Sequence, residues 1–371
     1  MCDSADQISK RAIGEQRWND WRWQISQAVR IPGQLAAALP GCDEDRVAAA
    51  HRRFPLLVTP YYLALADSGD RLDPIRRMFE PDPLELSRNE HLDDDPIGEE
   101  RHAPLPGVVR RYPDRALLLV SGSCPVHCRH CTRRVLGRGR IRPLDADGFE
   151  TALEFLRVNP EIRDVIVSGG DALLLEDEQL LGMLDRIRAV PSVEIIRVGT
   201  RAPVALPMRV TPGLARGLAE RGPIYVNTQF NHPREVTAAS AAAAAELVDA
   251  GVPVASQSVL LAGVNDDAEV VEELCRALLR IRVRPYYLFV GDLVAGTGHL
   301  RAPLSAGVEI IDRLRGRLGG LGIPQLVVDL PGGHGKVPVG PEYVVRREPE
   351  RTVFRAPDGT TVDYPERICP R

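Results

Sequence analysis

From about residue 115 onward, short apolar runs alternate with segments in which the apolar positions recur at helical spacing. The apolar runs are rich in β-branched residues and nearly continuous, as is typical of strands that are covered on both faces. They predict seven strands, at 116–120, 164–167, 193–198, 224–228, 252–261, 284–290 and 325–329. The segments between them predict helices near 147–157, 176–189, 211–221, 235–250, 267–281 and 305–318.

This alternation predicts an α/β fold of right-handed βαβ units around a parallel sheet. Six or seven such units curl toward a full or partial barrel, which we expect over residues 106–340. Residues 1–105 are expected to form an N-terminal helical region, and the charged, proline-bearing segment 91–107 a surface connection. Residues 341–371 contain two β-rich runs around an Asp-Gly pair, which predict a C-terminal β-hairpin tail.

Composition excludes several classes of protein. The chain has 371 residues, enough for a sizeable core, and a formal net charge of −4. Nucleic-acid-binding proteins usually carry a basic excess, so no nucleic acid is expected as a partner. No apolar run approaches the ~18 residues needed to cross a bilayer, and the first residues lack the apolar segment of a secretory signal. A cytoplasmic protein without a membrane partner is therefore expected.

The cysteines are distributed unevenly along the chain. Three of the seven lie within eight residues, directly after the first predicted strand, at Cys124, Cys128 and Cys131. In a cytoplasmic chain such a group indicates metal or cluster binding rather than disulfides. Three thiolates can hold three corners of a 4Fe–4S cluster and leave one iron open to a small molecule.

The neighbours of these cysteines define the alternatives. We expect Arg129, Arg133 and Arg134 to lower the pKa of the thiols and to stabilise an anionic cluster. A zinc site is the first alternative, with His127 or His130 as the fourth ligand, because structural zinc takes four protein ligands. Free structural cysteines are the second alternative.

Lysine is scarce in this chain, because Lys10 and Lys336 are its two lysines among 47 basic residues. Arginine has replaced lysine wherever a positive charge suffices, so a retained lysine is a candidate for amine chemistry that arginine cannot perform. Lys336 lies in the glycine-rich segment PGGHGK, where its amine can form a Schiff base with an aldehyde cofactor. A surface lysine in a flexible turn is the alternative.

Acidic residues follow several predicted strands and are expected on the catalytic rim of a barrel. Asp292 and Asp329 would place two carboxylates there, which suits the cationic end of a substrate; N-caps or internal ion pairs are the alternative. Gly169 and Gly170 allow a ligand to approach the backbone closely. Asp171, which follows them, is equally well explained as a helix N-cap.

A compact cationic patch precedes the first predicted strand. It consists of Arg110, Arg111, Tyr112 and Arg115, and it suits a phosphate or a carboxylate. A solvated basic turn is the alternative explanation.

Seven stretches between about residues 18 and 365 resemble one family and occur in the order of that family. They are WNDWRWQ, RYPDR, CRHCTRR, SGGDALL, FNHPREVT, RPYYLFVGDL and DLPGGHGKVPVGPEYV. With the cysteine triad, they make the chain similar to the lysine 2,3-aminomutase family of radical S-adenosylmethionine enzymes. The resemblance implies a partial (β/α)6 barrel with three cofactors: a 4Fe–4S cluster, S-adenosylmethionine and pyridoxal 5′-phosphate. It also implies an electron donor such as flavodoxin or ferredoxin, and a homo-oligomer.

The resemblance further implies roles for single residues. The catalytic lysine, which would carry pyridoxal phosphate as an internal aldimine, is Lys336. The residues near that cofactor would be Arg111, Tyr112 and Arg115. The cluster ligands would be Cys124, Cys128 and Cys131, and the residues lining the S-adenosylmethionine site would be Gly169, Gly170 and Asp171. The α-carboxylate of the substrate would pair with Arg133, and its distal cation with Asp292 and Asp329.

The implied reaction moves the α-amino group of L-lysine to the β-carbon and gives β-lysine. An arginine 2,3-aminomutase that gives β-arginine is the alternative, because the two aspartates suit any basic side chain; a glutamate enzyme is disfavoured by them. Two readings from other classes are a non-catalytic iron–sulfur module and a pyridoxal-phosphate transaminase with a zinc site.

The chain departs from the family pattern at a few positions. Asp267 stands where longer members tend to have cysteine, and Cys369 is isolated near the C-terminal end, so we expect no intersubunit zinc. Gly291 and Gln229 replace a usual cysteine and a usual histidine near the expected pocket.

Overall fold

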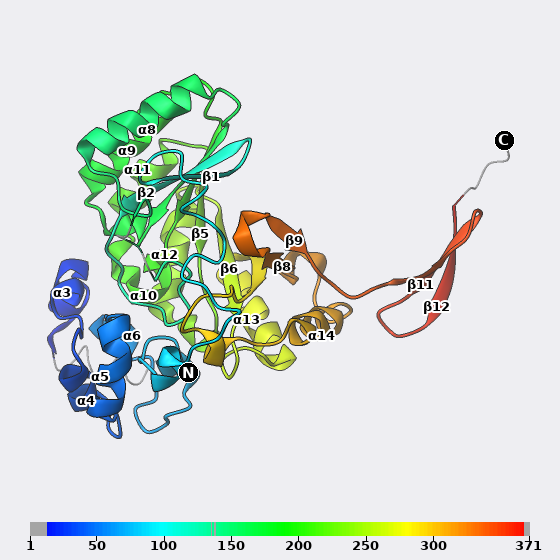
Figure 1. The fold of residues 1–371 in the computed structure, drawn as a ribbon, viewed down its shortest axis with the longest axis horizontal. Coiled ribbons are helices and arrows are strands. Elements are labelled where there is room, and N and C mark those ends of the chain that lie inside the picture. The colour runs from blue at the N-terminus through cyan, green and yellow to red at the C-terminus, as the bar shows by residue number, and fades with distance from the viewer. Residues whose placement is uncertain (1–12, 135, 137–138, 367–371) are drawn as a thin grey trace.

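A nine-stranded sheet forms the centre of the molecule (Figure 1). The computed structural model describes residues 13–134, 136 and 139–366. The strands lie side by side in chain order: β1 (Val108–Tyr112), β2 (Arg115–Ser121), β3 (Asp164–Gly169), β4 (Ile195–Gly199), β5 (Ile224–Thr228), β6 (Val254–Leu260), β7 (Arg284–Val290), β8 (Gln325–Asp329) and β9 (Lys336–Pro338). Strands β2 to β8 are parallel, while β1 and β9 pair antiparallel at the two edges. The seven predicted strands and the parallel α/β sheet are confirmed.

Helices connect successive parallel strands. They are α8 (Ala146–Val158), α9 (Asp177–Arg188), α11 (Pro212–Ala219), α12 (Ala238–Asp249), α13 (Ala268–Arg280) and α14 (Leu304–Leu314). Several begin at a side-chain cap, which satisfies a free backbone N–H at the helix start. Asp145 caps α8, Thr211 caps α11 and Asp267 caps α13. The six predicted helices are confirmed, and Asp267 is explained locally by its cap; Cys369 lies outside the described residues.

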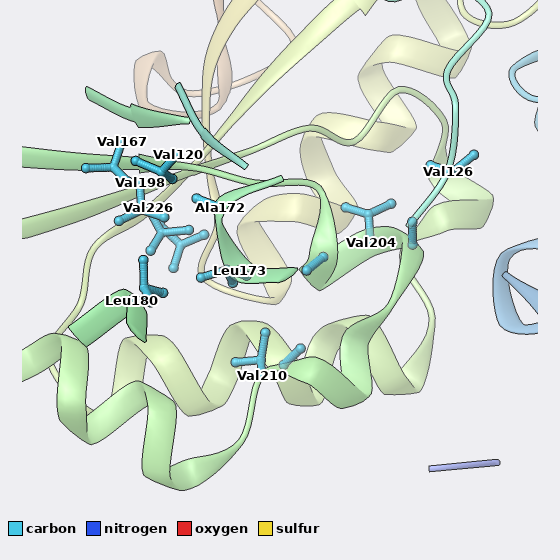
Figure 2. Packing of buried hydrophobic residues seen from close by; sticks show 14 of the residues in the cluster. Val120, Val126, Val167, Ala172, Leu173, Leu180, Val198, Val204, Val210 and Val226 are labelled. Carbon is cyan, nitrogen blue, oxygen red and sulfur yellow. The ribbon is translucent and has the colours of Figure 1, made fainter. Parts of the chain in front are cut away.

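The core lies between the sheet and these helices. Val167, Val198 and Val226, from three neighbouring strands, belong to the same buried cluster as Leu180 of α9 (Figure 2). Burial alternates along the strands, however, so every second residue points to the other face. That other face carries Ser168, Arg197, Asn227 and Gln257, and it borders a cavity. The expectation that both faces of the strands are covered is therefore wrong for this inner face. The polar residues within the predicted apolar strands are the sequence feature that indicates this uncovered inner face.

The N-terminal third of the chain is built of short helices. They are α2 (Glu15–Trp18), α3 (Trp21–Ser26), α4 (Pro32–Ala38), α5 (Glu44–Arg53), α6 (Pro60–Leu63), α7 (Pro74–Arg77) and the 3₁₀ turn η1 (Pro83–Leu86). Segment 91–107 is more than a surface connection, because Glu99 within it is 5% exposed. The backbone N–H of Asp93 also donates to the carbonyl oxygen of Leu293, which follows β7 (2.9 Å). The surface expectation for this segment is wrong at Glu99.

The C-terminal segment forms a small antiparallel sheet that projects from the body (Figure 1, red). Its strands are β10 (Val344–Arg347), β11 (Arg351–Arg355) and β12 (Thr361–Pro365). The predicted hairpin is β11–β12, and β10 adds a third strand that the sequence pattern did not predict. Tyr343 holds the base of this sheet to α14 through a hydrogen bond to Asp312 (3.1 Å). Among the described residues, none of the helices has the length and apolar character needed to cross a membrane.

Candidate active site

One cavity of about 610 Å³ extends from the carboxyl ends of the parallel strands along the inner face of the sheet. Each site residue implied by the family resemblance lines it: Arg111, Tyr112, Arg115, Cys124, Cys128, Cys131, Arg133, Gly169, Gly170, Asp171, Asp292, Asp329 and Lys336. These residues come from segments more than 200 positions apart in sequence, so the fold brings them together. The cysteine triad and Lys336 therefore face the same space.

The cysteine loop follows β2 and packs tightly on the turn after β3. A Cβ atom at Gly170 would lie 2.4 Å from the carbonyl oxygen of Ser123 and 3.0 Å from Sγ of Cys124. Gly169 has a φ of +131°, and a Cβ there would lie 2.4 Å from the carbonyl oxygen of Ser121. These two glycines thus bring the cysteine loop close to β3, whereas the sequence suggested close approach of a ligand.

Burial dominates the protonation of the cysteine thiols. It raises the pKa of Cys124 well above its usual value and that of Cys131 to about 11. Arg133 and Arg134 lower the pKa of Cys131 only in part. The expected lowering of the pKa by neighbouring arginines is therefore confirmed for Arg133 and Arg134 at Cys131, but burial outweighs it. All three thiols are free, and no three His, Cys, Asp or Glu side chains within the described ranges are grouped to hold a single metal ion.

The arginines next to the cysteines bind carboxylates instead. Arg129, whose side chain is fully buried, donates two hydrogen bonds to Glu85 (2.8 and 2.6 Å). Arg134 contacts the same carboxylate, and the guanidinium groups of Arg129 and Arg134 lie 4.4 and 4.3 Å from the centre of the Phe54 ring. Arg133 donates two hydrogen bonds to Glu99 (3.0 and 2.7 Å). These pairs fix the cysteine loop onto the N-terminal region, at η1 through Glu85 and at segment 91–107 through Glu99.

Substitution Glu85→Ala is expected to destabilise the protein strongly, because it leaves two buried guanidinium groups without their carboxylate. Removal of one partner of a buried ion pair costs about 3–5 kcal/mol. Thermal unfolding of the full chain measures the loss. The control is Glu161→Ala, which removes the exposed partner of Arg110 and should leave unfolding nearly unchanged. Equal losses in the two variants would show that Glu85 contributes no special stability.

The two rim aspartates have different environments. Asp292 accepts a hydrogen bond from Oγ1 of Thr132 in the cysteine loop (2.6 Å), and burial raises its pKa above the usual range. Burial alone would also raise the pKa of Asp329, but the Lys336 ammonium (2.8 Å) and the Arg111 guanidinium together hold it below that range. As the pH falls, Asp292 is therefore protonated before Asp329, and the rim loses the negative charge of Asp292 first.

Lys336 begins β9 after a turn in which Gly332, Gly333 and Gly335 all have positive φ. Its backbone N–H donates to Oη of Tyr112 (2.9 Å), and its Nζ lies 5.4 Å from the centre of the Phe289 ring. The side chain is 31% exposed and points to Asp329, so the amine is accessible from the cavity. This position differs from a freely solvated turn, the alternative that the sequence left open.

The cationic patch before β2 is split between two environments. The patch lies in a hairpin formed by β1 and β2, which differs from the solvated basic turn that was the alternative. Arg111, Tyr112 and Arg115 line the cavity, with the Arg115 guanidinium 4.5 Å from the centre of the Tyr112 ring. Arg110 instead donates to Glu161 at the surface (2.6 Å).

Several cavity residues were not predicted from the sequence. Tyr286 and Tyr287 stack with ring centres 3.9 Å apart, and their hydroxyl groups are 3.0 Å apart. Arg201, which follows β4, contacts Sγ of Cys128 through Nη1 (2.6 Å). His130 and Gln229, by contrast, were singled out from the sequence, as an alternative zinc ligand and as a departure from the family pattern; both line the cavity, and their Nε2 atoms are 3.1 Å apart. Two sequence signals point to the positions that were not predicted. Tyr286 and Tyr287 form an aromatic pair within a strand, and Arg201 is a polar residue just after a strand.

The carboxylate of Asp171 is occupied by hydrogen bonds from neighbouring residues. It accepts hydrogen bonds from Oγ1 of Thr200 (2.6 Å) and from the backbone N–H groups of Arg201 (2.7 Å) and Leu173 (3.0 Å). The last of these bonds caps the 3₁₀ turn η2 (Ala172–Leu174). Asp171 lines the cavity but acts as the cap that the sequence offered as its alternative role.

Comparisons with known proteins place this cavity in context. A family model described as "Radical SAM superfamily" matches residues 118–275, and one described as "Lysine-2,3-aminomutase" matches residues 311–368. The chain is 43% identical over 358 residues to the L-lysine 2,3-aminomutase of Clostridium subterminale, which covers 96% of this chain and 86% of that protein. The enzyme of the same name from Acetoanaerobium sticklandii is 42% identical over 356 residues, covering 95% and 86%.

A relative with a different name is the glutamate 2,3-aminomutase of Clostridioides difficile, 38% identical and covering 94% of this chain and 83% of that protein. Among solved structures, a radical SAM methyltransferase from Sphaerobacter thermophilus aligns with a TM-score of 0.43 and 20% identity, over 60% of this chain and 68% of that chain. The identity to named aminomutases over nearly the full length, together with the matching family models, identifies the enzyme class as an isomerase. Such enzymes use a 4Fe–4S cluster, S-adenosylmethionine and pyridoxal phosphate. The chain belongs to the lysine 2,3-aminomutase family of radical S-adenosylmethionine enzymes.

Proposed function

We propose that this protein moves the α-amino group of L-lysine to the β-carbon and releases β-lysine. The observation that carries the proposal is the single cavity that holds the cysteine triad, Lys336 and the two rim carboxylates, Asp292 and Asp329. Two carboxylates attract a distal ammonium and repel a carboxylate side chain, so they favour lysine over glutamate. The names of the relatives that are 43% and 42% identical agree with this choice.

The residues of the cavity fit an iron–sulfur cluster at the cysteine triad. The thiols are free and face the cavity from one loop, and three thiolates leave one iron open, as the chemistry requires. Each histidine that a zinc site would need has one ring nitrogen in another contact. Nδ1 of His127 lies 2.9 Å from the carbonyl oxygen of Pro55, and Nε2 of His130 contacts Gln229.

The cavity also fits the two organic cofactors. Buried polar atoms that line it, Nδ1 of His130 and Oγ1 of Thr228, have no hydrogen-bond partner in the part of the chain that the structure describes. A bound nucleoside can provide that partner, since buried polar groups are normally hydrogen-bonded. Lys336 offers its amine, and Arg115 and the Tyr112 ring offer a cation and an aromatic face for a phosphorylated pyridine.

When bound, the cluster and S-adenosylmethionine supply hydrogen-atom abstraction, and pyridoxal phosphate supplies an electron-withdrawing aldehyde for the amino group. The protein holds the substrate between them. Asp292 and Asp329 bind the distal ammonium, and Arg133 pairs with the α-carboxylate. Asp329 and Arg133 already have partners, Lys336 and Glu99, so substrate binding exchanges those contacts for the charges of the substrate. The inner-face tyrosines and Phe289 exclude water from the reacting atoms.

Substitution Asp329→Asn is expected to raise KM for lysine about 10- to 100-fold, the loss that corresponds to one charge-assisted hydrogen bond. Asp292→Asn should act similarly while it retains an acceptor for Thr132. Steady-state kinetics and thermal unfolding measure binding and folding separately. Asp312→Asn, outside the cavity, is the control. A drop in stability as large as the loss of binding would instead assign Asp329 to its ion pairs with Arg111 and Lys336.

Finer features of this family are part of the same proposal. The sheet and its helices form a partial barrel of six units over residues 106–340, between a helical region (1–105) and the β-tail (341–371). Free cysteines suit a reducing compartment, so the protein works in the cytoplasm, with electrons from a flavodoxin or ferredoxin. Exposed apolar side chains on the C-terminal sheet, such as Val345 and Tyr364, support a homo-oligomer.

Product identification tests the proposed substrate. The reconstituted protein is incubated anaerobically with S-adenosylmethionine, a reductant and either lysine, arginine or glutamate, and the products are separated by chromatography and identified by mass spectrometry. We expect a β-amino acid from lysine and little from the other two. Preferential formation of β-arginine or β-glutamate would show that arginine or glutamate, rather than lysine, is the substrate.

A further inference from the structure

A buried arginine outside the cysteine loop contacts one of the cysteines. Arg201 follows β4, and its side chain is 7% exposed. Its Nη1 lies 2.6 Å from Sγ of Cys128. The arginines within the cysteine loop do not offer the same contact, because Glu85 and Glu99 bind them. Arg201 is thus the guanidinium that the fold brings to the triad.

The position of Arg201 is set by other groups than the sulfur. Nη2 donates to Oε1 of Glu235 (2.7 Å) and to Oη of Tyr62 (2.8 Å), and both of these side chains are fully buried. Tyr62 also donates to Glu235 (2.7 Å). The backbone N–H of Arg201 donates to Oδ2 of Asp171 (2.7 Å), so the turn after β3 also fixes the position of the arginine. These bonds fix the direction of the Arg201 guanidinium, while its buried Nε has no hydrogen-bond partner among the described residues.

We propose that Arg201 is a positioning residue that donates an N–H to Sγ of Cys128 and raises the reduction potential of the iron–sulfur cluster. This inference rests on the proposed function, because it requires the cluster at the triad. One electron enters the cluster from an external one-electron donor, no bond breaks, and the cluster becomes more negative by one charge. A fixed N–H donor and a positive charge at a ligand sulfur stabilise that reduced form.

The test uses the full chain, reconstituted anaerobically with iron and sulfide, without S-adenosylmethionine. Iron and sulfide contents measure loading, and a redox titration followed by electron paramagnetic resonance measures the midpoint potential. The variants are Arg201→Gln, Arg201→Lys and Glu235→Gln. The control is Arg209→Gln, which removes another buried arginine that pairs with Asp177 and does not line the cavity.

We expect Arg201→Gln to shift the potential to more negative values, and Arg201→Lys, which keeps the charge, to shift it less. Glu235→Gln should shift it to more positive values, because the charge of Arg201 then lacks its counter-charge. Arg209→Gln should keep the wild-type potential. Loss of the cluster from Arg201→Gln alone, with its apo form as stable as Arg209→Gln, would also support the positioning role.

An Arg201→Gln variant that loads its cluster fully and keeps the wild-type potential would overturn the inference. A shift to more negative potential in Glu235→Gln, as in Arg201→Gln, would also overturn it. A common fall in thermal stability and loading in Arg201→Gln and Arg209→Gln would also overturn it, since it would assign Arg201 a structural role. Failure of the wild-type chain to bind a cluster would instead overturn the proposed function itself, so the two outcomes are distinct.

Discussion

We expect the Cys128→Ala variant to lose cleavage of S-adenosylmethionine altogether. The three thiolates from one loop are the protein ligands of the proposed cluster, and two thiolates hold a four-iron cluster poorly. Without the cluster there is no electron for cleavage. Iron and sulfide analysis after reconstitution measures loading, and release of 5′-deoxyadenosine under reducing conditions measures cleavage. Release should fall to the level of an assay without protein.

Cys275→Ala is the matched control for this prediction. Cys275 is buried on α13 and packs with Leu260, Ile310 and other residues of a separate core cluster, and it does not line the cavity. This variant should load its cluster and cleave S-adenosylmethionine like the wild type. Full cleavage by Cys128→Ala, or equal losses in the two variants, would remove the triad from the chemistry.

The Lys336→Ala variant should keep cleavage of S-adenosylmethionine but lose conversion of the amino acid. Its cysteine triad is intact, so cluster loading and cleavage of S-adenosylmethionine persist. Conversion of the amino acid should fall by more than about 10⁴-fold, because the amine that holds the aldehyde cofactor is gone. Parallel assays of 5′-deoxyadenosine and of the β-amino acid product measure the two activities in one sample.

The scarcity of lysine makes this prediction sharp. The chain has two lysines, so reduction of the loaded protein with borohydride should attach the pyridoxal group to the peptide that contains Lys336. Lys10→Ala is the control and should keep full turnover; Lys10 lies outside the described residues. Normal turnover by Lys336→Ala without an added amine, or attachment at Lys10, would contradict the role of Lys336.

The sequence predicted the parallel sheet well, because each strand and helix is a local pattern. Strands β5, β7 and β8 begin and end at the predicted residues. Edge strands were harder. β1 was hidden in a basic patch, since an edge strand needs few apolar residues. β10 was missed because its side chains are exposed and its pattern carries no burial signal.

The site was predictable where a motif carries its own chemistry, as in the cysteine triad and Lys336. Long-range partners were not predictable. Glu99 lies in a charged segment that resembles a surface loop, yet it is buried against Arg133. Arg201 lies 73 residues after Cys128, and no spacing rule joins them. The pairing of Asp329 with Lys336 and Arg111 depends on the antiparallel edge strand β9, which places position 329 opposite position 336.

Transfer of deuterium from substrate to cofactor tests the central claim most directly, because it requires the triad and the lysine site to act in one cavity. The reconstituted protein is incubated anaerobically with S-adenosylmethionine and lysine that carries deuterium on the β-carbon, and the recovered S-adenosylmethionine and 5′-deoxyadenosine are analysed by mass spectrometry. We predict deuterium in the deoxyadenosyl group with the wild type and none with Lys336→Ala. Efficient cleavage by the wild type without any deuterium transfer would contradict the account.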